Sequence, residues 1–425
     1  MNKSPFELLE RKRFGNKLEP EEVRTIVRGA ADGSWGDAEL GAFLMASAIQ
    51  GLDVEETASL TAAMLESGEQ WSLGKEVPLL VDKHSTGGVG DKVSLILSPL
   101  LAACGVPVVM LTGRALGHSG GTADKLESIP GVRLDFDRAR CLELLSDVGI
   151  AMGIATDEIA PADRRLYALR DRTGTVSSVS LVVGSILSKK LATGASAIVF
   201  DVKTGSGAFF AEEDQARELC RRLVGTCQEL GVRSSGLITD MSEPLGQWVG
   251  HSAEVMESLA CLEGRGNERL MEVVFALCEE AARLVGAPVD RTRLEEAIGS
   301  GEARARFIDW AVAQGASASF LRNPDFDLGP VEAVIEANRS GVLTDVDTRR
   351  IGELVSAAGR RSDGYIDYSV SLAYKAEIGQ EIEPGQELCR LYLRSADPQR
   401  VRALSDCFEI ADEGVAPDLI RDTVR

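Results

Sequence analysis

The sequence of 425 residues is poor in residues that bind transition metals, and it has no long apolar run. It contains only three histidines, and its eight cysteines are scattered from Cys104 to Cys407 without any C-x-x-C pair. No zinc pattern can be built from this set, and dispersed thiols are typical of a reducing cytosol, so we expect a cytoplasmic protein. The first residues, MNKSPFELLERKRFG, are too charged for a secretory signal, and no apolar run reaches membrane-spanning length.

Positive charge is also scarce. The chain has 46 lysine and arginine residues against 66 aspartate and glutamate residues, which gives a formal net charge of −20. A surface this acidic repels nucleic acid and anionic membranes, so we expect neither as a partner. Any anion site must therefore be locally basic, which draws attention to four cations: Lys83, Arg114, Arg170 and Lys189.

Two segments that combine glycine with hydroxyl and basic side chains are the most informative part of the chain. Residues 81–92 read VDKHSTGGVGDK, and residues 111–127 read LTGRALGHSGGTADKLE. Glycines let backbone N–H groups approach an anion closely, while hydroxyl groups and lysine add donors and charge. The apolar run 77–81 precedes the first segment, and a run with helical spacing, 93–104, follows it. A strand, a glycine loop and a helix start together predict a phosphate site.

The best-known nucleotide-binding motifs do not fit these segments. The P-loop requires G-x-x-x-x-G-K-[ST], whereas Gly87, Gly88 and Gly90 have another spacing. The dinucleotide fingerprint requires a glycine at the position that Val93 occupies. Glycines that merely form turns are the alternative, but two clusters with basic and hydroxyl neighbours argue against it. The pattern favours a compact anion such as orthophosphate.

These motifs resemble those of the thymidine phosphorylase and pyrimidine-nucleoside phosphorylase family. The stretch DKHSTGGVGD (82–91) is similar to the phosphate loop of the family, and TGRALGHSGGTADKLESIPG (112–131) is similar to its signature. Three further blocks follow in the same order: YALRD (167–171), SILSKKL (185–191) and DVKTGSGAF (201–209). The likeness covers nearly the whole chain, which is thus identified by resemblance as a member of this family.

The resemblance implies reversible phosphorolysis of thymidine or deoxyuridine, with uridine open as a third substrate, to free base and a pentose 1-phosphate. Phosphate is then a co-substrate, and no organic cofactor is required. By resemblance, phosphate is bound by Lys83, Ser85, Ser94, Thr112 and Thr122. The nucleoside is bound by Leu116, Tyr167, Arg170, Val182, Ser185 and Lys189. Arg170 and Lys189 stabilise the charge on the departing base, while His84, near its ordinary pKa, donates a proton or a hydrogen bond to a base carbonyl.

Simpler interpretations compete at several positions. Within LRDR, Arg170 fits a helix-surface ion pair. Lys189 and Lys190 are adjacent, so on a helix they point in different directions, and at most one is expected to enter the site. His118 and His251 fit packed structural roles.

The resemblance also implies a site for a monovalent cation such as potassium. Some relatives bind this ion at positions that correspond to Gly90, Leu245, Trp248 and Glu257. A further position, threonine in those relatives, is Lys92 here. A lysine ammonium could replace the ion, so the sequence leaves open which of the two fills the site.

The order of helices and strands predicts an α/β protein. Helix-start signals predict helices only over the first seventy residues. Short apolar runs then alternate with helices, which predicts a mostly parallel sheet. The expected strands are 77–81, 107–111, 197–201 and 237–240. Residues 362–393 alternate polar and apolar side chains, which predicts a small antiparallel unit of the barrel-sandwich kind. Since no methionine follows Met271, the Met-Lys-Met tip of a biotin carrier is absent there.

The resemblance implies how these segments combine into domains. Residues 1–70 and 161–194 form a mainly α-helical domain, and residues 75–155 and 195–335 form an α/β phosphate-binding domain that faces it across a cleft. Residues 340–425 form a C-terminal domain that contains the β unit. The resemblance further implies a homodimer, assembled through the helical domain.

Two other functions fit parts of the sequence. Anthranilate phosphoribosyltransferase has a related architecture, but it carries a KHGN motif and an acidic pair for magnesium–pyrophosphate, and TGRALGHSGG contains no such asparagine. A non-catalytic homologue that binds nucleoside or phosphate is the second alternative, because Gly174, Ser180 and Gly184 are unusual for the family. Gly184 is next to Ser185, which leaves the preference for base and sugar open.

Overall fold

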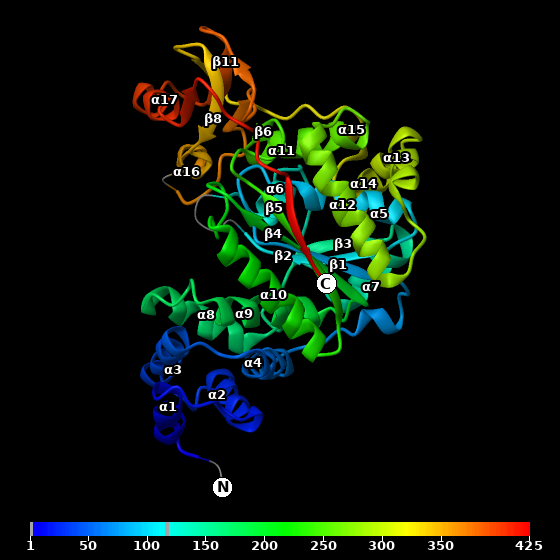
Figure 1. Ribbon diagram of the computed structural model, residues 1–425. Coiled ribbons are helices and arrows are strands. Elements are labelled where there is room, and N and C mark those ends of the chain that lie inside the picture. Colours follow the sequence, from blue (N-terminus) through cyan, green and yellow to red (C-terminus); the bar gives the residue numbers. More distant parts are fainter. Residues whose placement is uncertain (1–2, 115–118, 362) are drawn as a thin grey trace.

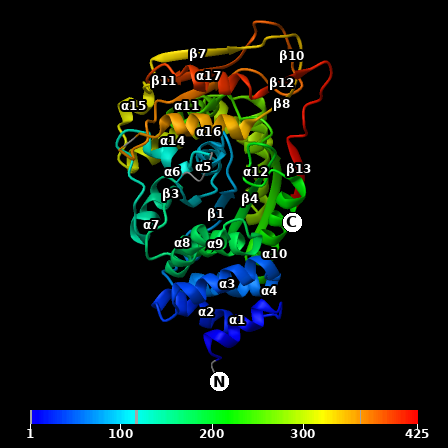
Figure 2. The same cartoon turned by 90° about the vertical axis from the view of Figure 1, so that its left-hand side faces the viewer.

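The computed structural model describes residues 3–114, 119–361 and 363–425. Figures 1 and 2 show its parts stacked in one direction: helices at the N-terminal end, a helix-flanked sheet in the middle and small sheets at the opposite end. The predicted fold class, with a mainly helical part, a mostly parallel α/β part and a small antiparallel β unit, is confirmed. None of the described helices is both long and apolar enough to cross a membrane.

Six helices pack together in the N-terminal part. They are α1 (Pro5–Arg13), α2 (Pro20–Asp32), α3 (Asp37–Gln50), α4 (Val54–Glu66), α8 (Pro161–Thr173) and α9 (Val179–Ala192). Reciprocal hydrogen bonds between Ser4 and Glu7 form a capping box that starts α1, and a second box starts α4. Leu166 of α8 and Leu181 of α9 lie in one apolar core with side chains of the first four helices. Segments far apart in the sequence therefore share this core.

A six-stranded sheet forms the middle of the molecule, in the order β13-β5-β4-β1-β2-β3. Its strands are β1 (Val81–Ser85), β2 (Val108–Thr112), β3 (Ile150–Ile154), β4 (Ala197–Thr204), β5 (Arg233–Asp240) and β13 (Ile420–Val424). All neighbours are parallel except β13, which is antiparallel to β5. The surrounding helices are η1 (Leu73–Lys75), α5 (Val93–Ala103), α6 (Thr122–Glu127), α7 (Arg138–Asp147), α10 (Glu213–Glu229), α11 (His251–Leu262), α12 (Glu268–Val285), α13 (Arg291–Gly299), α14 (Glu302–Ala313) and α15 (Ala318–Arg322).

Two features of this sheet differ from the sequence prediction. The first strand begins at Val81, where the predicted run ends, because Leu79 has φ +59° and left-handed backbone does not continue a strand. Strand β3 was not predicted, and its sequence IAMGI contains a glycine, which is unfavourable in strands. A Cβ at Gly153 would meet Phe136 Cε1 at 2.2 Å, so the glycine is needed for close packing.

The C-terminal part contains two small antiparallel sheets, β10-β8-β12 and β6-β9-β11-β7. Their elements are β6 (Trp248–Val249), β7 (Val331–Glu336), β8 (Gly341–Val346), β9 (Ser371–Tyr374), β10 (Glu381–Ile382), β11 (Glu387–Leu393) and β12 (Phe408–Ala411), with helices α16 (Thr348–Gly359) and α17 (Pro398–Ser405). Three strands cross the expected domain limits. β6 and β7 pair with β9 and β11 of the C-terminal part, whereas β13 returns to the main sheet.

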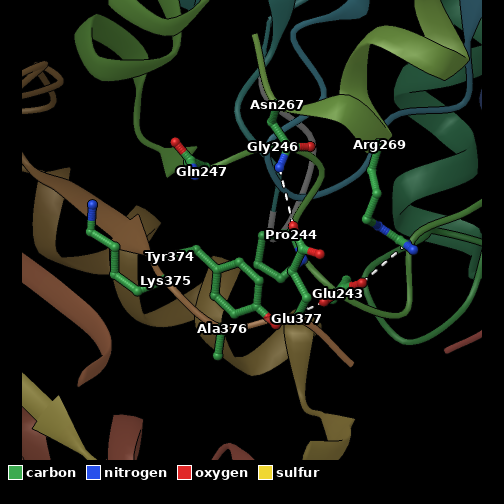
Figure 3. A pocket seen from close by; sticks show the side chains of 10 residues that line it. All are labelled: Glu243, Pro244, Gly246, Gln247, Asn267, Arg269, Tyr374, Lys375, Ala376 and Glu377. Carbon is green, nitrogen blue, oxygen red and sulfur yellow. Dashed lines mark hydrogen bonds and ion pairs between the residues drawn. The ribbon is translucent and has the colours of Figure 1, made fainter. Parts of the chain in front are cut away.

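The buried carboxylate of Glu243 joins the α/β part to the C-terminal part (Figure 3). It accepts hydrogen bonds from Tyr374 Oη and Ile378 N, each at 2.9 Å, and lies 3.1 Å from the Arg269 guanidinium. Burial raises the pKa of Glu243, and Arg269 opposes this effect. The remaining space beside these side chains is only about 20 Å³, roughly that of one water molecule. We therefore interpret this small pocket as a junction between parts, not as a ligand site.

Candidate active site

A cavity of about 530 Å³ lies between the carboxyl ends of β1 and β2 and the helices α8 and α9. Open α/β sheets bind ligands outside the carboxyl ends of their strands. From the sheet side the cavity is lined by the predicted residues Lys83, His84, Ser85, Ser94, Thr112 and Thr122. From the helical side it is lined by the predicted residues Tyr167, Arg170, Val182, Ser185 and Lys189. Leu116, also predicted, lies outside the described residues.

Lys83 is fully buried on β1. Its Nζ donates a hydrogen bond to Ser94 Oγ at 3.2 Å and lies 3.4 Å from Asp201 Oδ2. Ser94 is in the first turn of α5, where free N–H groups and the helix dipole favour an anion. In the loop between, Gly87 and Gly90 have φ of +80° and +78°, which glycine adopts without strain. The strand, the loop and the helix start thus bring a cation and N–H donors to the same end of the cavity.

A carboxylate, Asp91, also borders this end of the cavity. It accepts a hydrogen bond from the Ser85 hydroxyl and so orients that group. Burial acts to raise the pKa of Asp91, but the charges of Lys83, Lys203 and Lys125 outweigh burial and hold the pKa well below its usual range. Asp91 is therefore an anion that fixes the loop and has no proton to donate at neutral pH.

The second glycine segment contributes Thr112, at the end of β2, and Thr122, at the start of α6. The cation near them, Arg114, has a half-exposed side chain and donates two hydrogen bonds to the Glu127 carboxylate. The structure therefore brings two hydroxyl groups to the end of the cavity that is predicted to bind phosphate, whereas the Arg114 charge is already matched by an acid.

On the helical side, Arg170 is buried and is not part of a surface ion pair. Its guanidinium donates to the carbonyl oxygens of Leu181 at 3.1 Å and Val176 at 2.6 Å, and it lies 5.4 Å from the ring centroid of Tyr167. Burial lowers the pKa of Arg170, although arginine stays charged at neutral pH. No carboxylate among the described residues forms a salt bridge with it. A buried cation bonded only to carbonyls is suited to an anionic ligand.

Lys189 also lines the cavity and has an acidic partner that sequence reasoning missed, Asp163. Asp163 accepts hydrogen bonds from Lys189 Nζ and, at 3.0 Å, from Ser185 Oγ. The sequence does contain a signal for it. Asp163, Tyr167 and Arg170 are spaced at i, i+4 and i+7 on α8, which places them on one helix face.

The adjacent lysine, Lys190, points elsewhere, as the sequence predicted for this pair. Its Nζ donates to Asp82 Oδ1 at 2.8 Å and to the Lys83 carbonyl at 3.1 Å. Burial raises the pKa of Asp82 to about 6, although Lys190 acts to lower it. Lys190 therefore joins α9 to β1, while Lys189 remains the lysine with an accessible ammonium.

His84 departs from the expectation of an ordinary pKa. Burial, together with the charges of Lys190 and Lys83, lowers the pKa of His84 well below its usual value. The imidazole is therefore neutral at physiological pH. In this state it can donate a hydrogen bond to a substrate carbonyl, but it does not carry the proton of an imidazolium ion.

The four residues predicted to bind a monovalent cation do lie together, but they surround Lys92. The buried Lys92 ammonium donates to the Leu245 carbonyl at 2.6 Å and lies 2.8 Å from Glu257 Oε2. Glu257 also accepts from the Trp248 amide at 3.0 Å, and a Cβ at Gly90 would come within 2.9 Å of Leu245 O. Burial acts to lower the pKa of Lys92, but Glu257 outweighs it and the pKa is raised. A charged ammonium thus occupies the position, and the site does not fit a separate ion.

The unusual glycine beside Ser185 faces away from the cavity. A Cβ at Gly184 would lie 3.0 Å from Met64 Cε and 3.3 Å from Leu60 Cδ2, both on α4. The glycine therefore lets α9 approach α4 closely. Because of this packing role, Gly184 is no argument against the predicted binding of the base on this side of the cavity.

Comparison with known proteins agrees with this geometry. A model for the α/β domain of a glycosyl transferase family matches residues 77–304, and a model for the helical bundle domain of a glycosyl transferase family matches residues 6–68. The chain is 41% identical to a thymidine phosphorylase of Sinorhizobium fredii, over 96% of both chains. It is 38% identical to a pyrimidine-nucleoside phosphorylase of Bacillus subtilis, over 98% of this chain and 99% of the relative.

A solved structure shares the fold alone. Anthranilate phosphoribosyltransferase from Thermus thermophilus matches with a TM-score of 0.57 at 20% sequence identity. The match covers 99% of that protein but 72% of this chain, so this chain carries a part that the neighbour lacks.

Proposed function

The chain belongs to the glycosyl transferase family whose curated members include thymidine phosphorylases and pyrimidine-nucleoside phosphorylases. On this premise, we propose that it catalyses the reversible phosphorolysis of thymidine or deoxyuridine, with uridine as a further candidate substrate. The products are the free pyrimidine and a pentose 1-phosphate. Phosphate is the co-substrate, and no organic cofactor takes part in the reaction.

One observation carries this proposal: the two ends of the cavity are lined by different kinds of polar groups. On the sheet side, Lys83 and Ser94 meet at the glycine loop and the start of α5. On the helical side, Arg170 and Lys189 supply two cations beside the Tyr167 ring. A ligand that places phosphate at the first end and a pyrimidine at the second has its anomeric carbon between them. The cavity volume of about 530 Å³ is in the range that small-molecule sites occupy.

In the proposed reaction, a phosphate oxygen forms a bond to the anomeric carbon while the bond from that carbon to the pyrimidine nitrogen breaks. The electron pair of the broken bond stays on the base, which becomes an anion. The base anion then takes up the proton that the attacking hydrogen phosphate gives up, so the products are the neutral base and the pentose 1-phosphate dianion. Lys83 and the hydroxyls of Ser85, Ser94, Thr112 and Thr122 hold phosphate in line for attack. Arg170 and Lys189 line the helical side of the cavity, where their positive charges stabilise the negative charge that grows on the base. His84, as a neutral imidazole, adds a hydrogen bond there.

The alternative functions are less well supported. The likeness to anthranilate phosphoribosyltransferase is at the level of fold, whereas the phosphorylase relatives match over nearly the full chain. A non-catalytic nucleoside sensor would not need both the phosphate-binding and the base-binding groups in one cavity.

The proposal predicts that the purified protein releases free base from pyrimidine nucleosides only when phosphate is present. Thymidine, deoxyuridine and uridine are each incubated with and without millimolar phosphate, and free base is followed by chromatography. Release without phosphate would indicate a hydrolase. If all three nucleosides stay intact with phosphate present, the protein is not a phosphorylase.

We expect Lys83 and Lys189 to serve different substrates. Lys83→Ala removes the ammonium at the phosphate end, so it should mainly raise the KM for phosphate. Lys189→Ala removes a cation that stabilises the departing base, so kcat should fall about a hundredfold or more, which corresponds to roughly 2–4 kcal/mol. Steady-state kinetics with each substrate varied in turn test this division. The exposed Lys75 provides a matched control, and equal changes in both Michaelis constants would contradict the assignment.

We also propose that the enzyme needs no potassium, since the Lys92 ammonium already bonds to Leu245 O and Glu257. The wild-type rate should be the same in sodium and potassium buffers of equal ionic strength. Lys92→Thr leaves the carbonyl and the carboxylate without a cation, so its activity should be low in sodium and recover in potassium. A wild-type rate that rises severalfold with potassium would show that an ion is still required.

We propose that the protein is a cytoplasmic homodimer assembled through its helical part. Its eight cysteines are free thiols, which fits a reducing compartment. Helices α1 and α3 pack together, and three apolar side chains on them or directly after α1 are exposed: Phe6 (70%), Phe14 (66%) and Ile49 (72%). A second copy can cover this apolar surface. Light scattering at micromolar concentration should give twice the chain mass, and Ile49→Asp should shift it toward the monomer. A monomeric wild-type mass would contradict the dimer.

A further inference from the structure

Two fully buried lysines share one carboxylate beneath the phosphate end of the cavity. Asp201 Oδ1 lies 2.8 Å from Lys203 Nζ, and Asp201 Oδ2 lies 3.4 Å from Lys83 Nζ. The hydroxyl of Thr239 donates to Asp201 Oδ1 at 2.7 Å and accepts from Lys203 Nζ at 3.0 Å. These four side chains form one closed polar cluster, which we call the Asp201 cluster.

The strand register explains why the cluster forms. Ser85 of β1 pairs with Asp201 of β4, and Lys203 of β4 pairs with Thr239 of β5. Residues two apart on a strand point to the same face of a sheet, so Lys83 shares the face of Asp201 and Lys203. Sequence reasoning noticed the motif DVKTGSGAF but assigned no role to the lysine within it.

The distances indicate how the carboxylate is divided between the two lysines. The shorter contact and the Thr239 hydrogen bond both hold Asp201 toward Lys203. Only Lys83 lines the cavity, whereas Lys203 does not reach it. Two ammonium groups against one carboxylate leave one positive charge in the cluster, on the side of Lys83. The nearby Asp91 carboxylate reduces this excess charge at longer range, because the charges of Lys83 and Lys203 outweigh burial and lower its pKa. It accepts a hydrogen bond from Ser85 and forms no salt bridge among the described residues, so it does not take the place of Asp201 as the direct partner of either lysine.

We propose that Lys203 is a positioning residue for phosphate: it retains the Asp201 carboxylate so that the Lys83 ammonium keeps its charge for the co-substrate. This inference deepens the proposed function and rests on it. Without Lys203, Asp201 would pair with Lys83 alone. A phosphate dianion would then meet a Lys83–Asp201 pair with no net charge. Because the site is buried, such a change in net charge is poorly screened by solvent.

The test is a double-mutant cycle on phosphate affinity. Lys203→Met should raise the KM for phosphate roughly tenfold or more, the usual effect of losing one charge-assisted interaction, while the KM for thymidine stays within about twofold. Adding Asp201→Asn removes the competing carboxylate, so the double variant should recover most of the phosphate affinity. A merely structural role predicts that the two losses multiply.

A milder variant, Thr239→Val, and a control, Ser235→Ala, allow the inference to be tested even if Lys203→Met does not fold. Thr239→Val removes the hydroxyl that holds Asp201 toward Lys203, so the KM for phosphate should rise by a smaller factor in a protein of nearly the same shape. Ser235→Ala, a buried change on the same strand β5 outside the cluster, should leave both Michaelis constants unchanged. If Lys203→Met does not fold, the Thr239→Val result decides.

The failures of the two proposals are distinguishable. A wild-type protein without phosphate-dependent release of base overturns the proposed function itself. An active wild type overturns this inference alone in either of two cases. The first is that folded Lys203→Met, or folded Thr239→Val, has an unchanged KM for phosphate. The second is that the double variant binds phosphate no better than Lys203→Met.

Discussion

A buried ion pair between Lys190 of α9 and Asp82 of β1 connects the helical side of the cavity to its sheet side. Each partner is next in sequence to a lysine of the proposed site: Lys190 follows Lys189, and Asp82 precedes Lys83. Lys190 also donates to the Lys83 carbonyl at 3.1 Å, so the contact includes the backbone of the strand. The helix that carries Lys189, the lysine proposed to act on the base, and the strand that carries Lys83, the lysine proposed to bind phosphate, are thereby fixed to each other. Breaking such a buried pair is far more costly than losing a surface one.

Several other buried cations around the cavity follow the same rule of pairing. Lys92 is matched by Glu257, and Lys125 by Glu254. In each pair the acid neutralises the charge of the lysine and the contact holds a loop in place. These pairs therefore make the structure more rigid but do not increase its affinity for an anion. The exception on the helical side is Arg170, which bonds to backbone carbonyls and forms no salt bridge with the described residues. Because Arg170 has no acidic partner among the described residues, its charge is the one best placed to stabilise a departing base anion.

The sequence predicted those features that depend on local patterns. Capping signals located α1 and α4, and the adjacency of Lys189 and Lys190 correctly predicted that their side chains diverge. What it missed depends on contacts between distant residues or on backbone geometry. Asp163 lies 26 residues from Lys189 in sequence, and the apolar run 77–81 gave no sign of the left-handed backbone at Leu79. The pKa of His84 likewise depends on burial and on Lys190, neither of which local sequence specifies.

The likeness to anthranilate phosphoribosyltransferase extends to the fold alone, so the reaction of this chain must be argued from the charges in its cavity. Both chains share a helical part and an α/β sheet at a TM-score of 0.57, yet fold alone does not determine function. A transferase that uses magnesium–pyrophosphate needs free carboxylates to hold the metal. Asp91, which lines this cavity, accepts a hydrogen bond from Ser85. Behind the lining, Asp163 is paired with Lys189 and Ser185, and Asp82 with Lys190. These acids already have partners, and cations line both ends of the cavity, which supports the proposal that phosphate binds at one end and the departing base at the other.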